Sequence, residues 1–249
     1  MGISMLKRIF KTAEDVKGVI LDYGGTLDSR GVHWSEVIWA AYQASGIPVS
    51  KEQFRESYVE GERELARNRH ILPQDDFHEL LLKKMRIELG DLAKKGLIDE
   101  GQTEQWAQET AAYCDRSARE CVEEARPVLE ELSKRLPLVL VSNFYGNIDS
   151  VLRAYNIRQY FKGIIESAVV GVRKPNPTLF RLGVDVLELE PEEVLVVGDS
   201  LRKDIEPAET LGCHVMWLKG KGWTEEEDAY THACMISDIS EVLKVLNCE

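Results

Sequence analysis

The chain has 249 residues, with 31 Lys or Arg against 43 Asp or Glu, so its formal net charge at pH 7 is −12. This acidity argues against nucleic acid and against an anionic membrane surface as partners, because both are bound through clustered cations. A hydrophobic content of 44% with 30% charged residues is typical of a folded globular protein. No apolar run approaches the roughly 18 residues of a membrane-spanning helix, so we expect no membrane partner.

Cysteine usage indicates a reducing compartment. The cysteines form no CxxC pair, and their odd number argues against a disulfide framework. They are Cys114, Cys121, Cys213, Cys234 and Cys248. The start of the chain also lacks the long apolar stretch and the small-residue cleavage site of a signal peptide. We therefore expect a cytoplasmic protein with buried, reduced thiols.

The first predicted element is a strand over residues 18–22. Its apolar run ends in Asp22, and Gly24 and Gly25 follow directly. This pattern predicts a buried strand and then a tight loop.

A helical block follows, over about residues 33–125. Side chains recur at helical spacing, as at Leu81, Lys84 and Met85, and Gly or Pro residues interrupt the pattern in three places. We therefore expect a bundle of four or five helices and no strand. Its aromatic residues are expected to form its core: Trp39, Tyr42, Phe54 and Tyr58. Arg63 and Arg67 alternate with glutamates, which predicts a solvated, salt-bridged face.

The rest of the chain alternates between short apolar strands and helices. The strands are predicted at 138–141, 163–165, 194–197 and 215–218. The helices are predicted at 148–155, 177–187, 204–211 and 239–246. This alternation predicts an α/β fold with a parallel sheet covered on both faces. Strand 18–22 is equally apolar and must join that sheet, so the helical block is an insertion. The acidic run 225–227 is predicted to lie at the surface.

Polar side chains follow the predicted strands, at the edge where ligands bind in open parallel sheets. Asp22, Ser142, Asn143 and Asp199 stand at strand ends, and Lys174 precedes a helix. Two carboxylates at one point repel unless a cation lies between them. Mg²⁺ prefers such hard oxygen ligands and also suits phosphate. The sequence therefore predicts a magnesium and phosphate site at this edge.

These residues, in this order, resemble the four motifs of the haloacid dehalogenase superfamily of hydrolases. Asp22, in the run LDYGGTL, matches the nucleophile motif, Ser142 the phosphate-binding hydroxyl and Lys174 the motif-three lysine. Asp199 and Asp204, in the run GDSLRKD, match the metal-binding acids. The resemblance covers the whole chain. It implies a three-layer, Rossmann-like parallel-sheet core of residues 1–28 and 127–249, with an inserted all-helical C1-type cap of residues 29–126.

The resemblance also implies an activity, a Mg²⁺-dependent phosphatase acting on a small phosphorylated metabolite. Asp22 would attack phosphorus and form an aspartyl-phosphate, with Lys174 neutralising the oxygens. The implied phosphate-binding residues are Thr26, Ser142, Asn143 and Lys174. The implied Mg²⁺ ligands are Asp22, the backbone carbonyl of Gly24, Asp199 and Asp204. A cap over the site restricts access to small molecules.

The sequence departs from the family pattern at Gly24. Family phosphatases carry there a second aspartate, which protonates the leaving group and later activates water, and glycine has no side chain to do either. General acid–base help is typically worth about 10²–10⁴-fold in rate. His33, in the loop after the first motif, could supply the proton instead. Alternatively, the substrate could have a leaving group that needs none, such as an acyl phosphate.

Two further readings stay open. One is phosphonatase-like C–P hydrolysis, since similar enzymes have a small residue at this position and use a cap lysine. No cap lysine stands out here among Lys51, Lys83, Lys84, Lys94 and Lys95. The other is a catalytically weakened protein that binds a phosphorylated ligand or partner as a regulator. Dehalogenation is less expected, because family dehalogenases have a bulkier residue in place of Gly24.

Overall fold

The structure is a computed structural model that describes residues 15–247 of the chain. The expectations about the start of the chain and about Cys248 fall outside these residues. Within them, no helix combines the length and the apolar character that crossing a membrane requires. The four described cysteines are buried and free, which confirms the expectation of unpaired thiols for Cys114, Cys121, Cys213 and Cys234.

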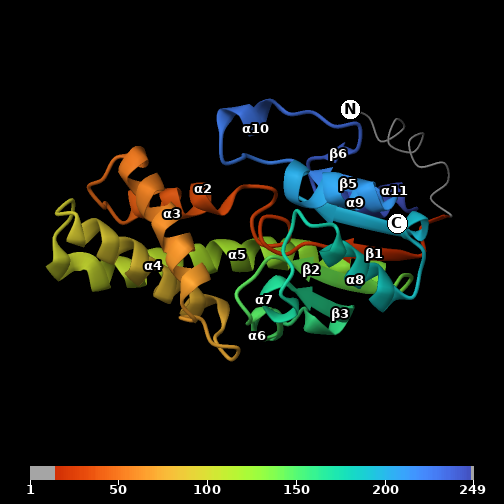
Figure 1. Cartoon of the computed structure of the whole chain (residues 1–249), viewed down its shortest axis with the longest axis horizontal. Helices are drawn as coiled ribbons and strands as arrows, with labels where there is room; N and C mark the ends of the chain where they lie inside the picture. Colours follow the sequence, from red (N-terminus) through yellow and green to blue (C-terminus); the bar gives the residue numbers. More distant parts are fainter. Residues whose placement is uncertain (1–14, 248–249) are drawn as a thin grey trace.

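The core of the molecule is a six-stranded sheet in which every neighbouring pair is parallel (Figure 1). In spatial order the strands are β3 (Phe161–Glu166), β2 (Leu138–Ser142), β1 (Gly18–Leu21), β4 (Val194–Gly198), β5 (His214–Leu218) and β6 (Met235–Ile236). The central strands β1, β2 and β4 are buried along their whole length. They are nearly continuous apolar runs because helices cover both faces of a parallel sheet. The predicted α/β class is confirmed.

Short helices pack around this sheet. They are α6 (Ile148–Ala154), α7 (Ser167–Val170), α8 (Thr178–Leu187), α9 (Glu206–Leu211) and α11 (Glu241–Val245). Helix α8 lies on β1, β2 and β3, and α9 lies on β5. The predicted helix at 204–211 differs at its start. A wider π-type turn, Leu201–Ile205, precedes α9, and this turn carries Asp204.

The predicted helical block between the first two strands is also present. It consists of α2 (Trp34–Ala44), α3 (Lys51–Arg67), α4 (Phe77–Lys94), the 3₁₀ turn η2 (Glu100–Gln102) and α5 (Thr103–Ser133). Helices α3 and α4 each begin with a capping box, at Ser50 and Asp76, which fixes where they start. Tyr42 and Phe54 are fully buried inside the block, with ring centroids 4.9 Å apart, so these aromatics form core as predicted.

One helix joins this block to the sheet. Helix α5 runs from the cap to the sheet (Figure 1) and continues past the predicted end at residue 125 to Ser133. Its last turns bury Leu129 and Leu132. The expected border between cap and core, at residues 126 and 127, therefore lies inside a continuous helix, at Pro127. We refer to α2–α4 and the first half of α5 as the cap.

A segment that the sequence did not predict crosses from the sheet to the cap. Residues 219–234, which we call the strap, contain helix α10 (Glu225–Ala229) and lead into β6. Figure 1 shows α10 extending from the end of the sheet formed by β5 and β6 toward the cap helices. None of the α10 residues is buried, which agrees with the predicted surface position of the acidic run. Both elements are too short for their periodicity to be visible in the sequence.

Candidate functional site

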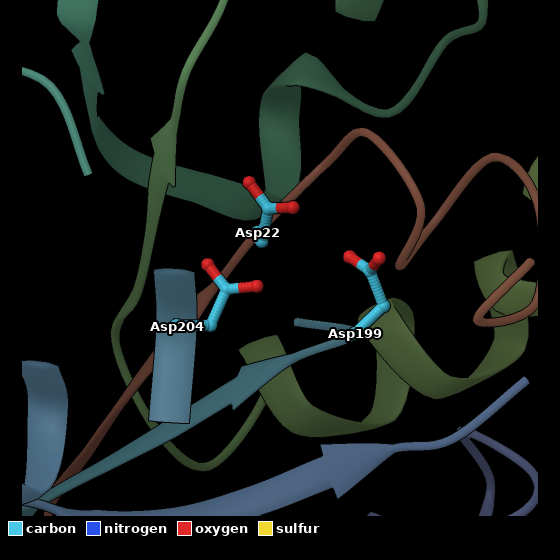
Figure 2. A group of neighbouring side chains, drawn as sticks. All are labelled: Asp22, Asp199 and Asp204. Atoms are coloured by element: carbon cyan, nitrogen blue, oxygen red, sulfur yellow. The ribbon is translucent and has the colours of Figure 1, made fainter. Parts of the chain in front are cut away.

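Three carboxylates meet at the carboxyl edge of the sheet. Asp22 follows β1, Asp199 follows β4, and Asp204 comes from the π-type turn after β4. Each offers an oxygen that lies within 4.8 Å of the others, and Figure 2 shows the three groups gathered around one space. The parallel pairing of β1 with β4 puts Asp22 and Asp199 side by side. Asp204 is held by the Ser200 N–H, which donates to its Oδ2 at 3.0 Å.

A buried lysine neutralises part of this charge. Lys174 Nζ lies 2.7 Å from Asp22 Oδ1 and 2.6 Å from Asp204 Oδ1, and its side chain is 2% exposed. Burial alone would lower the pKa of Lys174, but Asp204 and Asp22 outweigh burial and keep it above its usual value. The ammonium is therefore charged and bridges two of the three carboxylates.

The remaining charge fits a divalent cation. Three carboxylates and one ammonium leave a formal charge of −2 in a buried space. Burial, followed by the charges of Asp204 and Asp22, raises the pKa of Asp199 well above its usual range. The donors are hard carboxylate oxygens, which are the ligands that Mg²⁺ prefers. Gly24 lies at the same cavity, and the role of its carbonyl remains a prediction.

Of the predicted phosphate-binding residues, Ser142 faces the cavity, whereas Asn143 and Thr26 hydrogen-bond to other residues of the site. Ser142 reaches the cavity and hydrogen-bonds to Asp22. Asn143 also borders the cavity, but its side chain brackets the backbone of Lys174. Its Oδ1 accepts from Lys174 N–H at 2.9 Å, and its Nδ2 donates to the Lys174 carbonyl at 3.2 Å. Thr26 donates to Asp199 Oδ1 at 3.0 Å, so its hydroxyl orients that carboxylate. Contacts of Asn143 and Thr26 with phosphate remain predictions.

The loop after Asp22 is held by an aspartate that sequence reasoning missed. Asp28 is 1% exposed, and its carboxylate accepts from the Gly25 N–H at 2.7 Å and from Trp34 Nε1 at 3.0 Å. Burial raises the pKa of Asp28 to about 8. Gly25 has φ +100°, and a Cβ there would lie 2.3 Å from Asp199 Oδ2, so only glycine fits.

The proposed replacement acid, His33, lies at the cavity but is neutral at pH 7. It caps α2, where its Nδ1 accepts from the Ser35 N–H at 3.2 Å. Its ring packs against Tyr58 and Trp223, at centroid distances of 6.2 and 5.3 Å. Burial, assisted by the charges of Lys203 and Lys84, lowers the pKa of His33 to about 4. An imidazole with this pKa holds no extra proton to donate at neutral pH, which argues against His33 as the acid.

A cavity of about 940 Å³ connects these groups with the cap. The cap contributes Tyr58, Glu62 and Lys84 to its wall, and the core contributes Tyr145. Sequence reasoning did not single out Lys84, although a lysine on the apolar stripe of α4 is a visible signal. The expected salt-bridged face of α3 is confirmed, since Arg63 and Arg67 both pair with Glu60.

Comparison with known proteins identifies relatives whose sequences resemble this chain. The family model for haloacid dehalogenase-like hydrolases matches residues 16–212. Phosphoglycolate phosphatase of Shigella dysenteriae is 25% identical over 94% of this chain and 93% of that protein. Phosphoserine phosphatase of Thermus thermophilus is 30% identical over 48% of each protein. Haloacid dehalogenase-like hydrolase domain-containing protein 3 of Bos taurus is 30% identical over 43% of each. The chain thus spans less than half the length of the last two relatives.

Solved structures share the fold. A HAD-hydrolase of Bacillus subtilis bound to magnesium aligns with a TM-score of 0.58 at 16% identity, over 93% of this chain and 99% of that one. A 2-haloacid dehalogenase of Pseudomonas syringae aligns with a TM-score of 0.52 at 23% identity, over 93% of this chain and 98% of that one. With the family model covering most of the sequence, the chain belongs to the haloacid dehalogenase-like hydrolases.

Proposed function

We propose that this hydrolase is a Mg²⁺-dependent phosphatase of small phosphorylated metabolites that works through an aspartyl-phosphate on Asp22. The observation that carries the proposal is the buried Lys174 ammonium bridging Asp22 and Asp204 beside Asp199. Such a centre offers one nucleophile together with the positive charge that phosphoryl transfer needs. Relatives named as phosphatases support it.

In the first step, Asp22 attacks phosphorus and the bond to the leaving oxygen breaks. Lys174 and the Ser142 hydroxyl hold the phosphoryl oxygens, and Asn143 positions Lys174 through its backbone. When bound at Asp22, Asp199 and Asp204, with the Gly24 carbonyl, Mg²⁺ supplies positive charge to the same oxygens. In the second step, water attacks phosphorus and the bond to the Asp22 oxygen breaks. The proton of the water passes to the departing inorganic phosphate, and the Asp22 carboxylate is restored.

The leaving group must depart without a proton from residue 24. A Cβ at Gly24 would meet nothing within 4 Å, so no neighbouring side chain fills the position of the missing acid. Phosphates with acidic leaving groups, such as acyl and aryl phosphates, are therefore the favoured substrates. Alkyl esters are expected to react more slowly.

Domain roles and location complete the proposal. Residues 29–126 act as the cap over the core of residues 1–28 and 127–249, and the protein works in the cytoplasm. The buried free cysteines within residues 15–247 support a reducing environment.

A C–P hydrolase is less well supported. Lys84 is a cap lysine at the cavity, but a Schiff base needs a neutral amine. Burial opposes the charge of Lys84, yet Glu62 outweighs burial and holds the pKa of Lys84 well above its usual value. The regulatory alternative rests on Gly24 alone. It predicts Mg²⁺-dependent binding of phosphate esters without turnover.

Phosphate release from acyl, aryl and alkyl phosphates, with and without Mg²⁺, tests the proposal. We expect Mg²⁺-dependent turnover whose rate decreases from acyl to aryl to alkyl phosphates. A chelator should abolish this turnover, and so should the Asp22→Asn substitution. Tight binding of all three classes without release would favour the regulatory alternative. Release that persists in Asp22→Asn would contradict the assigned nucleophile.

A further inference from the structure

A buried charged group in the cap faces the same cavity as Asp22. Lys84 lies on the apolar face of α4, between Leu81 and Met85, and its side chain is 5% exposed. A buried ammonium is costly unless it is paired and hydrogen-bonded. Replacing such ion pairs by apolar residues is often neutral or stabilising. The position of Lys84 therefore calls for an explanation beyond the stability of the cap.

Its partners come from both halves of the molecule. Lys84 forms an ion pair with Glu62 of α3, and its Nζ lies 4.5 Å from the centroid of the Tyr58 ring. Tyr145, three residues after Ser142, donates its hydroxyl to the Glu62 carboxylate at 3.0 and 3.2 Å. We call Glu62, Lys84 and Tyr145 the cap subsite. It links the cap to the loop that carries the phosphate-binding serine.

The cap subsite retains hydrogen-bonding capacity toward the cavity. An ammonium has three donors. Among residues 15–247, the one hydrogen-bond acceptor of Lys84 is Glu62. The remaining donors belong to a group that lines the cavity and is otherwise almost completely shielded from solvent. They suit oxygen atoms of a ligand.

The wall around the cap subsite is positively charged in a chain of net charge −12. Outside the reacting centre it carries six cationic side chains: Arg63, Lys84, Arg173, Arg202, Lys203 and Lys221. Three of them, Arg63, Arg202 and Lys221, also pair with glutamates outside the cavity. Glu62 and Glu227 are the two carboxylates there. Lys203 forms no ion pair within residues 15–247, and its charge acts on both His33 and Glu62. Such a wall attracts anionic substrates and positions their charges.

We propose that the cap subsite selects phosphate esters that carry a second anionic group, a carboxylate or a second phosphate, on the organic part. Lys84 is the specificity-determining residue, and Lys203 supplies further charge from the core side. This inference rests on the proposed phosphatase function. It makes the two ends of the cavity complementary to the two charged ends of one substrate.

Three aryl phosphates test the inference: one with a ring carboxylate, its methyl ester, and one with a second phosphate. In the wild type, kcat/KM should be higher for the carboxylate and the second-phosphate substrates than for the methyl ester. The Lys84→Gln variant should lose about 10–100-fold of that preference, the usual worth of a hydrogen bond to a charged group. The loss should appear mainly in KM, while the methyl ester keeps its kcat. The ratio of kcat/KM for the carboxylate substrate to that for the substrate with a second phosphate shows which anion the cap subsite prefers.

Lys83→Gln is the matched control, because Lys83 is the adjacent lysine but pairs with Asp75 and does not line the cavity. It should leave the preference unchanged. Lys203→Gln should reduce the preference in part. Because Lys203 is exposed, this variant still tests the role of cavity charge if Lys84→Gln fails to fold. Equal kcat/KM for all three esters in the wild type would overturn the inference and leave the phosphatase proposal intact.

Calorimetry of the same esters with the Asp22→Asn variant compares their affinities in the absence of turnover. The two esters with a second anionic group should bind more tightly than the methyl ester. Loss of this difference in the Asp22→Asn, Lys84→Gln double variant would support the cap subsite even if no ester is hydrolysed. Indifferent binding would overturn it. Absence of hydrolysis together with selective binding would count against the phosphatase proposal alone.

Discussion

Two adjacent glycines in the loop after Asp22 differ in what the backbone requires of them. Gly25 has φ +100°, and a side chain there would collide with the Asp199 carboxylate. Gly24 lies outside the left-handed region, and a Cβ at this position would point into open space. Backbone geometry therefore requires glycine at 25 and does not require it at 24. The absence of an acid at 24 is a chemical property of this enzyme that a single substitution can change.

Gly24→Asp is expected to increase alkyl phosphate turnover. A carboxylic acid at this position could protonate the leaving oxygen, and such help is typically worth about 10²–10⁴-fold. Formation of the aspartyl-phosphate from an acyl phosphate, which needs no acid, should change little in single-turnover measurements. Gly24→Ala controls for the added Cβ and should give no increase, whereas Gly25→Ala should lose activity. An unchanged ratio of alkyl to acyl rates in Gly24→Asp would contradict this account of the missing acid.

Sequence reasoning expected the side chains of the reacting centre to meet because parallel strands end at one edge, and the loop before α8 brings Lys174 to the same edge. Asp22, Asp199 and Lys174 are therefore close together in the structure. It assigned Asn143 to phosphate, and it could not foresee that the Asn143 amide also bonds the backbone of a residue 31 positions away. It also missed Lys84, whose place on the apolar stripe of α4 was a visible signal, and Asp28, whose burial in a loop leaves no periodic signal.

At the scale of elements, the strap connects the sheet to the cap, and a tryptophan lies at the centre of this contact. Trp223 packs against His33 and Tyr58, and the Arg55 guanidinium lies 4.6 Å from the centre of its ring. Arg55 also donates to the Trp223 carbonyl at 2.6 Å. The strap thus closes one side of the cavity, and its packing on α3 holds the cap over the site.

Trp223→Ala should loosen this contact and destabilise the protein. Aromatic and cation–π contacts of this kind are worth roughly 1–3 kcal/mol together. Hydrogen exchange should become faster in residues 219–234 and in α3, and KM should rise more than kcat falls. Glu225→Gln changes an exposed α10 side chain that does not line the cavity and should have little effect. Unchanged exchange in α3 would show that the strap does not hold the cap.

For the whole molecule, the strand and helix pattern was largely predictable, and the long-range connections were not. Each central strand is a short continuous apolar run, which locates it in the sequence. The end of α5 was missed because the same helical period continues from cap to core through Pro127. The wide turn that carries Asp204 depends on contacts that periodicity does not report.

The molecule also carries buried acids that make its stability depend on pH. Glu88 in α4 is fully buried, and burial, only partly offset by Lys84, raises its pKa from 4.5 to about 8. The folded protein therefore holds a proton on Glu88 between these pH values, while the unfolded chain does not. This group stabilises the fold fully below pH 4.5, and its contribution is lost as pH rises toward 8.

Glu88→Gln should remove this part of the pH dependence. Between pH 5 and 8, the free energy of unfolding should fall more steeply in the wild type than in the variant. The difference should reach a few kcal/mol, since one unit of pKa shift corresponds to about 1.4 kcal/mol. Denaturant unfolding of both proteins across this range measures it, and groups common to both cancel. Parallel curves would show that Glu88 is ionised in the folded protein.

The central claim is that Asp22 carries the phosphoryl group during turnover. Rapid acid quench of the enzyme with Mg²⁺ and an acyl phosphate, followed by peptide mass analysis, tests this claim directly. We predict one added phosphoryl group on the peptide that contains Asp22, absent in Asp22→Asn and removed by hydroxylamine. Steady phosphate release with no phosphorylated peptide at any quench time, or with the group on another residue, would contradict the account.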